Sequence, residues 1–220
     1  MIHFPESTKV GLKIPKEKFY ANMEMTADMK RRFINLINHI VWQYKLSDST
    51  LNVGKGTMVV EIDVFEVYLK VKEVNTAIFD FIEQHFPRHT LFVLIYEEEA
   101  NLLVSYKEPI ANRPGKFKIL EKFQTDWMTK TQTQLELTID GLNMDQVYES
   151  LVRQIGRIKV ERENPLRIGQ SILNQQTKEK LQKQILLLEK KMHNEKQFNI
   201  QLKISNEIKS LEIELAKICK

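Results

Sequence analysis

Residues 58–71 read MVVEIDVFEVYLKV, and this stretch decides the fold class of the chain. Its apolar residues are crowded together, and most of them are β-branched or aromatic. That content is typical of a largely buried strand. A helix is expected to follow from Asn75 to Phe86, because Pro87 cannot continue it. A buried strand that leads into a helix predicts a domain with both α and β structure.

The flanking segments extend this pattern in both directions. Upstream we expect an extended segment and two helices, at 10–15, at 15–22 and from Thr26 to near Lys45. Downstream we expect four strands and a final helix, at 91–96, 102–106, 117–123, 135–139 and 143–158. The spacing of the apolar residues carries these assignments. Their order predicts an α+β fold with a mixed or mainly antiparallel sheet and flanking helices.

The segment from Ser171 onward differs from the rest because it contains no Gly or Pro. Its pattern predicts one helix of about 45 residues, about 68 Å long. An apolar seam at heptad spacing runs along this helix in two parts, which are out of phase around 195–201. The seam consists of Leu181, Ile185, Leu188, Met192, Ile204, Ile208, Leu211, Leu215 and Ile218.

This seam determines the predicted organisation of the chain. A single straight helix cannot bury a stripe against itself, so we expect a second copy, another protein or the head to cover it. We therefore predict a head domain at 1–160, a hinge at 161–170 and a coiled-coil helix at 171–220. The alternative is a frayed helix that folds back on its own head.

Charge and cysteine content indicate the compartment and the classes of binding partner that we expect for this protein. The net charge is +4, and all of the excess lies beyond Ser171, where ten lysines accompany six acidic residues. The formally neutral head argues against a globally basic nucleic-acid-binding domain, although a local patch remains open. The one cysteine, Cys219, fits a reducing compartment. We find no transmembrane run and no signal peptide, so we expect a cytoplasmic protein without a membrane partner.

Nucleotide and metal sites are poorly supported, and no resident cofactor is expected. The segment Gly54-Lys55-Gly56-Thr57 lacks the spacing of a phosphate loop and is interpreted as a turn. His85 and His89 are four residues apart, but Pro87 breaks the helix that would align them on a metal.

Acidic residues offer one catalytic alternative. Glu61 and Asp63 point to the same face of their strand under period-two alternation, while Glu66 points to the other face. Two carboxylates with Lys107 on a nearby strand could hold Mg²⁺ and an attacking water, as in a metal-dependent nuclease. An acid two residues before the lysine is missing, however, since that segment reads Ser105-Tyr106-Lys107. The competing interpretation is an ion-pair cluster at a sheet edge.

A basic region near the N-terminus offers a second alternative. Lys16, Lys30, Arg31 and Arg32 are close in sequence, and aromatic residues such as Trp42 follow. Such a patch would bind phosphates with release of counterions. The aromatic residues could equally belong to the core.

A set of short motifs, taken together, resembles the bacterial domain-of-unknown-function family 4391 over roughly Ile14 to Ile158. The motifs are IPKEKFY at 14–20, KRRF at 30–33, WQYKL at 42–46, TLNV at 50–53, EIDVFE at 61–66, SYKE at 105–108, TDW at 125–127 and GLNMD at 141–145. The resemblance implies a genomic setting beside helicases and DNA methyltransferases. It implies no catalytic residues. The residues that match the family pattern and suggest a functional surface are Lys16, Trp42, Glu61, Glu66, Lys107 and Trp127. The basic residues Lys30, Arg31 and Arg32 complete the candidate functional surface.

These observations favour a non-enzymatic accessory or adaptor subunit of a bacterial DNA-directed defence complex, restriction-like or anti-phage. It would assemble through its C-terminal helix, as a homo-oligomer or with a protein partner such as a helicase or methyltransferase. In this adaptor role the head would dock on a helicase or contact DNA. Mg²⁺ is expected only under the nuclease alternative.

Overall fold

A computed structural model of the protein describes residues 2, 4–18, 25–74, 76–111, 113, 115–129, 137–156 and 168–218. The chain divides into two units, Met1–Asn164 and Pro165–Lys220, which we call the head and the tail. No helix among the described residues is both long and apolar enough to cross a membrane.

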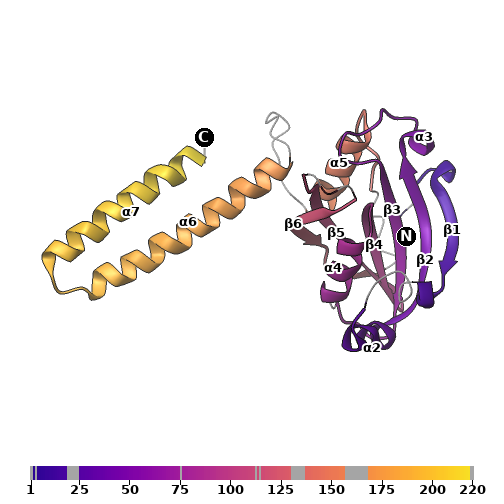
Figure 1. The fold of residues 1–220 in the computed structure, drawn as a ribbon, viewed down its shortest axis with the longest axis horizontal. Coiled ribbons are helices and arrows are strands. Elements are labelled where there is room, and N and C mark those ends of the chain that lie inside the picture. The colour runs from indigo at the N-terminus through magenta and orange to yellow at the C-terminus, as the bar shows by residue number, and fades with distance from the viewer. Residues whose placement is uncertain are drawn as a thin grey trace. The chain divides into compact units, whose positions relative to one another are not determined.

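The head is built on one seven-stranded sheet (Figure 1). Six strands follow in sequence order across it: β1 (Lys9–Ile14), β2 (Ile37–Ser47), β3 (Glu61–Leu69), β4 (His89–Tyr96), β5 (Glu99–Pro109) and β6 (Phe117–Gln124), while β7 (Met128–Thr129) pairs with β5. Only β3 and β4 pair in parallel. The predicted α+β fold with a mainly antiparallel sheet is therefore confirmed.

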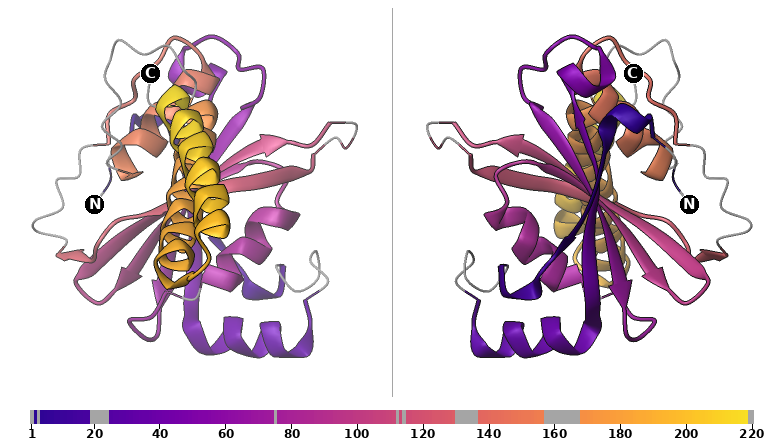
Figure 2. Two further views of the ribbon diagram at one scale, coloured as in Figure 1. Left: turned by 90° about the vertical axis from the view of Figure 1, so that its left-hand side faces the viewer. Right: turned by 90° about the vertical axis from the view of Figure 1, so that its right-hand side faces the viewer.

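Short helices and turns connect these strands. They are η1 (Glu6–Thr8), α2 (Ala27–Leu36), α3 (Asp48–Leu51), α4 (Thr76–His85) and α5 (Met144–Gly156). Helix α4 joins the two parallel strands, since a parallel pair needs a crossover connection. Figure 2 shows the strands fanning out from one another, which is the twist expected of a sheet of L-residues.

The two faces of the sheet have different partners. The core cluster on one face joins side chains of α2 and α4 with every second residue of the central strands, including Phe65, Val67 and Phe92. Glu61 and Asp63 share the parity of Phe65 on β3 and therefore point to the same face. Helix α5 packs against β5 and β6, and its Tyr148 stacks on Tyr106, whose parity on β5 is opposite to that of the core residue Leu103. The α2/α4 face thus carries both the core and the charged residues discussed below.

The predicted helix from Thr26 to near Lys45 is wrong in its second half. Thr26 does cap a helix, with its hydroxyl accepting from the amide of Met29, but that helix ends at Leu36. From Ile37 the chain continues as β2, which pairs with both β1 and β3. The β-branched residues in this segment fit a pleated surface, and ladder pairing on both sides overrides the helical spacing.

Two further predictions meet the limits of the described residues. Of the helix expected at 15–22, residues 16–18 are helical, and residues 19–22 lie outside the described residues. Of the strand expected at 135–139, the described residues 137–139 form no strand. Leu137 is nevertheless buried. The alternating apolar pattern of residues 135–139 therefore indicates burial and not pairing in the sheet.

The tail is a helical hairpin rather than the single helix predicted. Helix α6 (Ile168–Asn194) and helix α7 (Phe198–Ile218) pack against each other. The carboxylate of Glu195 accepts from the amides of Lys196 and Gln197, which stabilises the turn between them. All nine predicted seam residues are buried or half-buried. The statement that the seam cannot be buried by its own helix is therefore wrong, because the phase skip marks a turn that brings the two stripes together.

Candidate functional site

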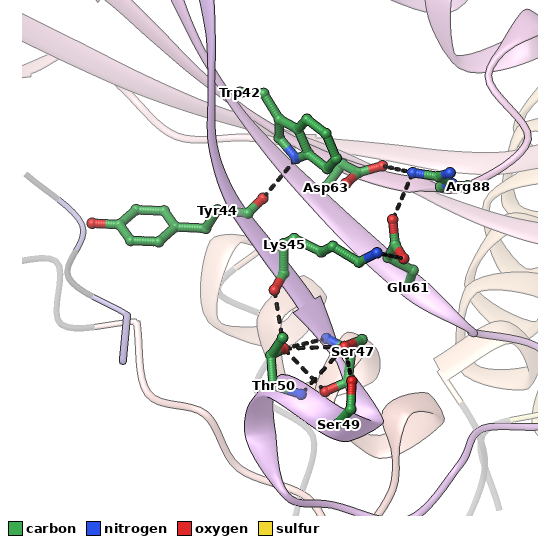
Figure 3. A network of polar contacts seen from close by, with 9 residues as sticks. All are labelled: Trp42, Tyr44, Lys45, Ser47, Ser49, Thr50, Glu61, Asp63 and Arg88. Atoms are coloured by element: carbon green, nitrogen blue, oxygen red, sulfur yellow. Dashed lines mark hydrogen bonds and ion pairs between the residues drawn. The ribbon is translucent and has the colours of Figure 1, made fainter. Parts of the chain in front are cut away.

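Four charged side chains meet at one end of β3 on the α2/α4 face, and we call them the Glu61–Asp63 cluster: Lys45, Glu61, Asp63 and Arg88 (Figure 3). Lys45 on β2 lies opposite Asp63 on β3 in the ladder. Its ammonium is 2.8 Å from Glu61 Oε2. Arg88, just before β4, places its NH1 2.6 Å from Glu61 Oε1 and 3.4 Å from Asp63 Oδ2. Two carboxylates are thus held between two cations.

The environment of Asp63 is unusual for a carboxylate. Its side chain is 0% exposed, and its Oδ1 atom is buried without a hydrogen-bond partner. Burial, together with the neighbouring Glu61 carboxylate, raises the pKa of Asp63 to about 6 against the opposing effect of Arg88. The oxygens of a carboxylate in water are solvated. Burying Asp63 Oδ1 without a hydrogen-bond partner therefore destabilises the folded state.

A second buried network lies beside the first, and we call it the Glu83–Lys107 pair. Glu83 of α4 is 1% exposed and Lys107 of β5 is 0% exposed, and their charged atoms are 2.5 Å apart. The Thr90 hydroxyl donates to Glu83, and the Lys107 ammonium also donates to the carbonyl of Arg88 at 2.5 Å. Burial raises the pKa of Glu83, opposed by the charge of Lys107. Arg88 joins the two networks, one through its side chain and the other through its carbonyl.

These distances bear directly on the nuclease alternative. Glu61 and Asp63 do lie together, but Lys107 pairs with Glu83 instead of with them. The lysine beside the two acids is Lys45. A nuclease built on this cluster would therefore use Lys45 and Arg88 as its cations. The described residues contain no group of three or more His, Cys, Asp or Glu side chains that could hold a metal ion.

The residues of the predicted basic region lie on or beside α2, and several of them are bound within the chain. Arg31 and Arg32 both pair with Asp28 on α2, at 2.9 and 2.7 Å. Lys16 instead donates to the carbonyl of Ile37 at 2.9 Å. Burial lowers the pKa of Lys16, and the nearby charge of Lys70 lowers it further. Lys30 lies on the same helix as the two arginines.

The two tryptophans and Glu66 of the predicted surface are largely structural in their contacts. Trp42 and Trp127 both pack against the core cluster. Trp42 also donates from Nε1 to the carbonyl of Tyr44 at 3.1 Å. Glu66 is buried on the opposite face of β3 from Asp63, where it accepts from the Tyr68 hydroxyl at 3.0 Å.

The glycine-containing segment at 54–57 wraps a carboxylate of the chain itself. Asp145, in the first turn of α5, accepts from the amides of Thr57, Met58 and Val59 and from the Thr57 hydroxyl, at 2.7–3.0 Å. Partial burial alone would raise the pKa of Asp145, but these bonds outweigh it and hold the pKa below its usual value. A Cβ at Gly56 would lie 2.3 Å from the Val59 carbonyl and 2.6 Å from Asp145. The amides that could bind a phosphate are therefore already occupied.

Three residues of these networks have no counterpart in the sequence-based prediction, namely Lys45, Glu83 and Arg88. Lys45 falls in the segment interpreted as helix, where its register against β3 cannot be inferred. Arg88 directly follows Pro87, which ends a helix just before a strand. That position was the available sign that Arg88 lies directly before β4. Glu83 sits on the inward face of α4 between apolar neighbours, and a charged residue at an inward helical position indicates a buried partner.

Comparison with known proteins gives one match. A family model described as "Domain of unknown function (DUF4391)" matches residues 2–215. The match includes the tail hairpin, beyond the 14–158 over which the motifs alone show the resemblance. Neither the curated proteins nor the solved structures contain a significant match.

Proposed function

The chain belongs to the DUF4391 family, and on that premise we propose that it is an accessory subunit that assembles a bacterial DNA-directed defence complex through its tail hairpin. The hairpin would bind another subunit of that complex or a second copy of the chain. The family setting beside helicases and DNA methyltransferases, implied by the motif resemblance, supports the choice of complex.

The observation that carries this proposal is the apolar surface that the hairpin leaves exposed after its seam is filled. Of the thirteen large apolar side chains that the structure describes as exposed, six belong to the tail. They include Phe198 at 73% and Leu187 at 66% exposure, and the others are Leu173, Leu186, Leu202 and Ile213. The tail supplies only about a quarter of the chain. Exposed apolar groups concentrated on a small unit indicate an interaction surface.

Part of this surface forms a groove beside the turn of the hairpin. The groove has a volume of about 510 Å³ and is lined by both helices, with Met192 on α6 and Phe198 and Leu202 on α7 as its apolar residues. The other lining residues are polar, namely Glu189, His193, Gln201 and Ser205. Apolar and polar side chains together are usual in a protein–protein contact, and an amphipathic helix of the partner would fit such a groove.

The charge of the tail is consistent with binding rather than with a further intramolecular contact. The tail carries all of the excess positive charge of the chain. Charged side chains at the margin of an apolar surface keep it soluble and steer a partner of opposite charge. An acidic surface on the partner would therefore bind faster at low salt.

Removal of the tail tests this proposal. The full chain and a form ending at Asn164 would each be co-expressed with the products of the neighbouring helicase and methyltransferase genes, and association would be measured by co-purification and light scattering. We expect the shortened form to lose its partner or its dimer. Unchanged associations and an unchanged oligomeric state would show that the tail has no such role.

A further inference from the structure

The orphan oxygen of Asp63 is a feature of the head that its contacts with cations do not explain. The Oδ1 atom is buried and has no hydrogen-bond partner. The other oxygen of the same carboxylate lies 3.4 Å from Arg88, which is the longest ion-pair contact of the Glu61–Asp63 cluster. A buried oxygen without a hydrogen bond destabilises the folded state, unless a partner from outside the chain binds it.

The composition of the cluster indicates what that partner would be. Mg²⁺ keeps several of its waters and binds through one or two carboxylates together with the phosphate oxygens of a ligand. Arginine and lysine are the residues that bind phosphate. Glu61 and Asp63 supply two carboxylates on one face of β3, and Lys45 and Arg88 supply the two cations beside them.

We propose that the Glu61–Asp63 cluster binds a divalent cation together with the phosphate group of a phosphodiester, as found in a nucleic acid strand. The cation is held by Asp63 Oδ1 and by Glu61, while Arg88 and Lys45 turn outward to the phosphate. The cluster then changes from an internal ion-pair network into a charge-matched site in which each side chain keeps a partner of opposite charge.

The geometry allows this exchange with small movements. Arg88 and Lys45 are 44% and 38% exposed, so both side chains can swing into solvent without breaking the core. Glu61 and Asp63 are fixed by the strand, and no backbone movement is needed to bring their carboxylates together. Arg88 leaves its 3.4 Å contact with Asp63 and its 2.6 Å contact with Glu61, and it gains a phosphate oxygen.

This inference is independent of the proposed role of the tail hairpin, and it involves no covalent step.

Binding of Mn²⁺ to the full chain tests the proposal, since free Mn²⁺ can be counted by electron paramagnetic resonance. We expect one saturable site per chain at pH 8. Asp63→Asn and Glu61→Gln should each weaken it at least tenfold. Glu66→Gln is the matched control, because Glu66 is a buried carboxylate on the opposite face of the same strand, and it should leave the affinity within twofold.

Arg88→Ala separates a ligand site from a structural ion pair. This variant removes a cation that competes with Mn²⁺, so Mn²⁺ alone should bind more tightly than to the wild type. A short oligothymidylate should tighten Mn²⁺ binding in the wild type and not in Arg88→Ala. Inorganic phosphate in place of the oligothymidylate distinguishes a free phosphate ligand from a strand, and an effect of inorganic phosphate alone would overturn the phosphodiester assignment.

Tryptophan fluorescence verifies that each variant is folded, and Glu61→Gln serves if Asp63→Asn is not. The proposal is overturned if the wild type shows no saturable Mn²⁺ site. It is equally overturned if Asp63→Asn and Glu61→Gln bind as the wild type does, or if Glu66→Gln loses affinity to the same extent.

Discussion

Removal of the Glu83 carboxylate should be among the most damaging single changes in the head. The Lys107 ammonium is 0% exposed, and in Glu83→Ala it keeps the carbonyl of Arg88 and the face of the Phe117 ring, but no carboxylate. Breaking a buried pair from one side costs about 3–5 kcal/mol, because the remaining charge is left uncompensated. For a domain of this size, about 4 kcal/mol lowers Tm by about 8–16 °C.

The reverse change should depend on pH. In Lys107→Met the buried Glu83 carboxyl, whose pKa burial already raises, loses the cation that opposes this rise. The folded form then binds a proton at a pH where the unfolded chain does not, so stability increases as pH falls through that window. The loss of stability in Lys107→Met is therefore smaller at pH 5 than at pH 8.

Urea unfolding followed by tryptophan fluorescence is the appropriate assay, since both tryptophans, Trp42 and Trp127, lie in the head. The double variant Glu83→Leu with Lys107→Met replaces both charges by apolar groups and should recover most of the loss, with a coupling energy of about 3 kcal/mol. A cost below about 1 kcal/mol for Glu83→Ala, or a double variant as unstable as the sum of the single ones, would refute this reasoning.

Four other changes should give distinct results. Asp63→Asn should gain stability relative to the wild type by up to about 3 kcal/mol as pH rises from about 4 to about 7, because the wild type is penalised above its raised pKa of about 6; pH-dependent urea unfolding measures this difference. Asp145→Ala should cost about 2–4 kcal/mol at pH 7 through four lost hydrogen bonds, and the difference should vanish as the pH falls through the depressed pKa of Asp145. Gly56→Ala should lower Tm, since its Cβ would overlap the Val59 carbonyl. Under the nuclease alternative, purified protein with Mn²⁺ should cleave DNA and Glu61→Ala should not; equal cleavage by both would assign the activity elsewhere.

The central strands could be predicted from the sequence because their residue composition favours β structure over a helix. In the segment 61–69, six of the nine residues are apolar and three of those six are β-branched, a composition typical of a buried strand. The shared face of Glu61 and Asp63 follows from the same alternation. The local sequence pattern was sufficient to predict an element wherever residue propensity and burial both favoured the same type of secondary structure.

The boundary between α2 and β2 could not be predicted in this way. Leu36, Ile37 and Ile40 are spaced as on a helix, and the strand emerges only because β1 and β3 both offer ladder partners to this segment. Lys45 was consequently misplaced, and with it the cation nearest to Glu61. Pairing between distant segments carries this information, and the local sequence does not contain it.

The tail shows a different limit. The seam residues are buried or half-buried within the hairpin, but heptad spacing is the same for a helix that pairs with another chain and for one that pairs with its own continuation. The phase skip around 195–201 was the only sign of a turn, since neither Gly nor Pro marks it. Glu195 performs the role that those residues usually have, by accepting from the amides of the turn.

The most direct measurement of the association role compares the full chain with a variant carrying Phe198→Glu and Leu202→Glu, two exposed residues of the tail groove. Leu142→Glu is the control, because Leu142 is an equally exposed apolar residue on the head. Co-purification from cells that express the neighbouring genes, with the mass of each complex read by light scattering, should show the partner or second copy lost only from the tail variant. Retention of every association by that variant, or an equal loss in the Leu142→Glu control, would contradict the account.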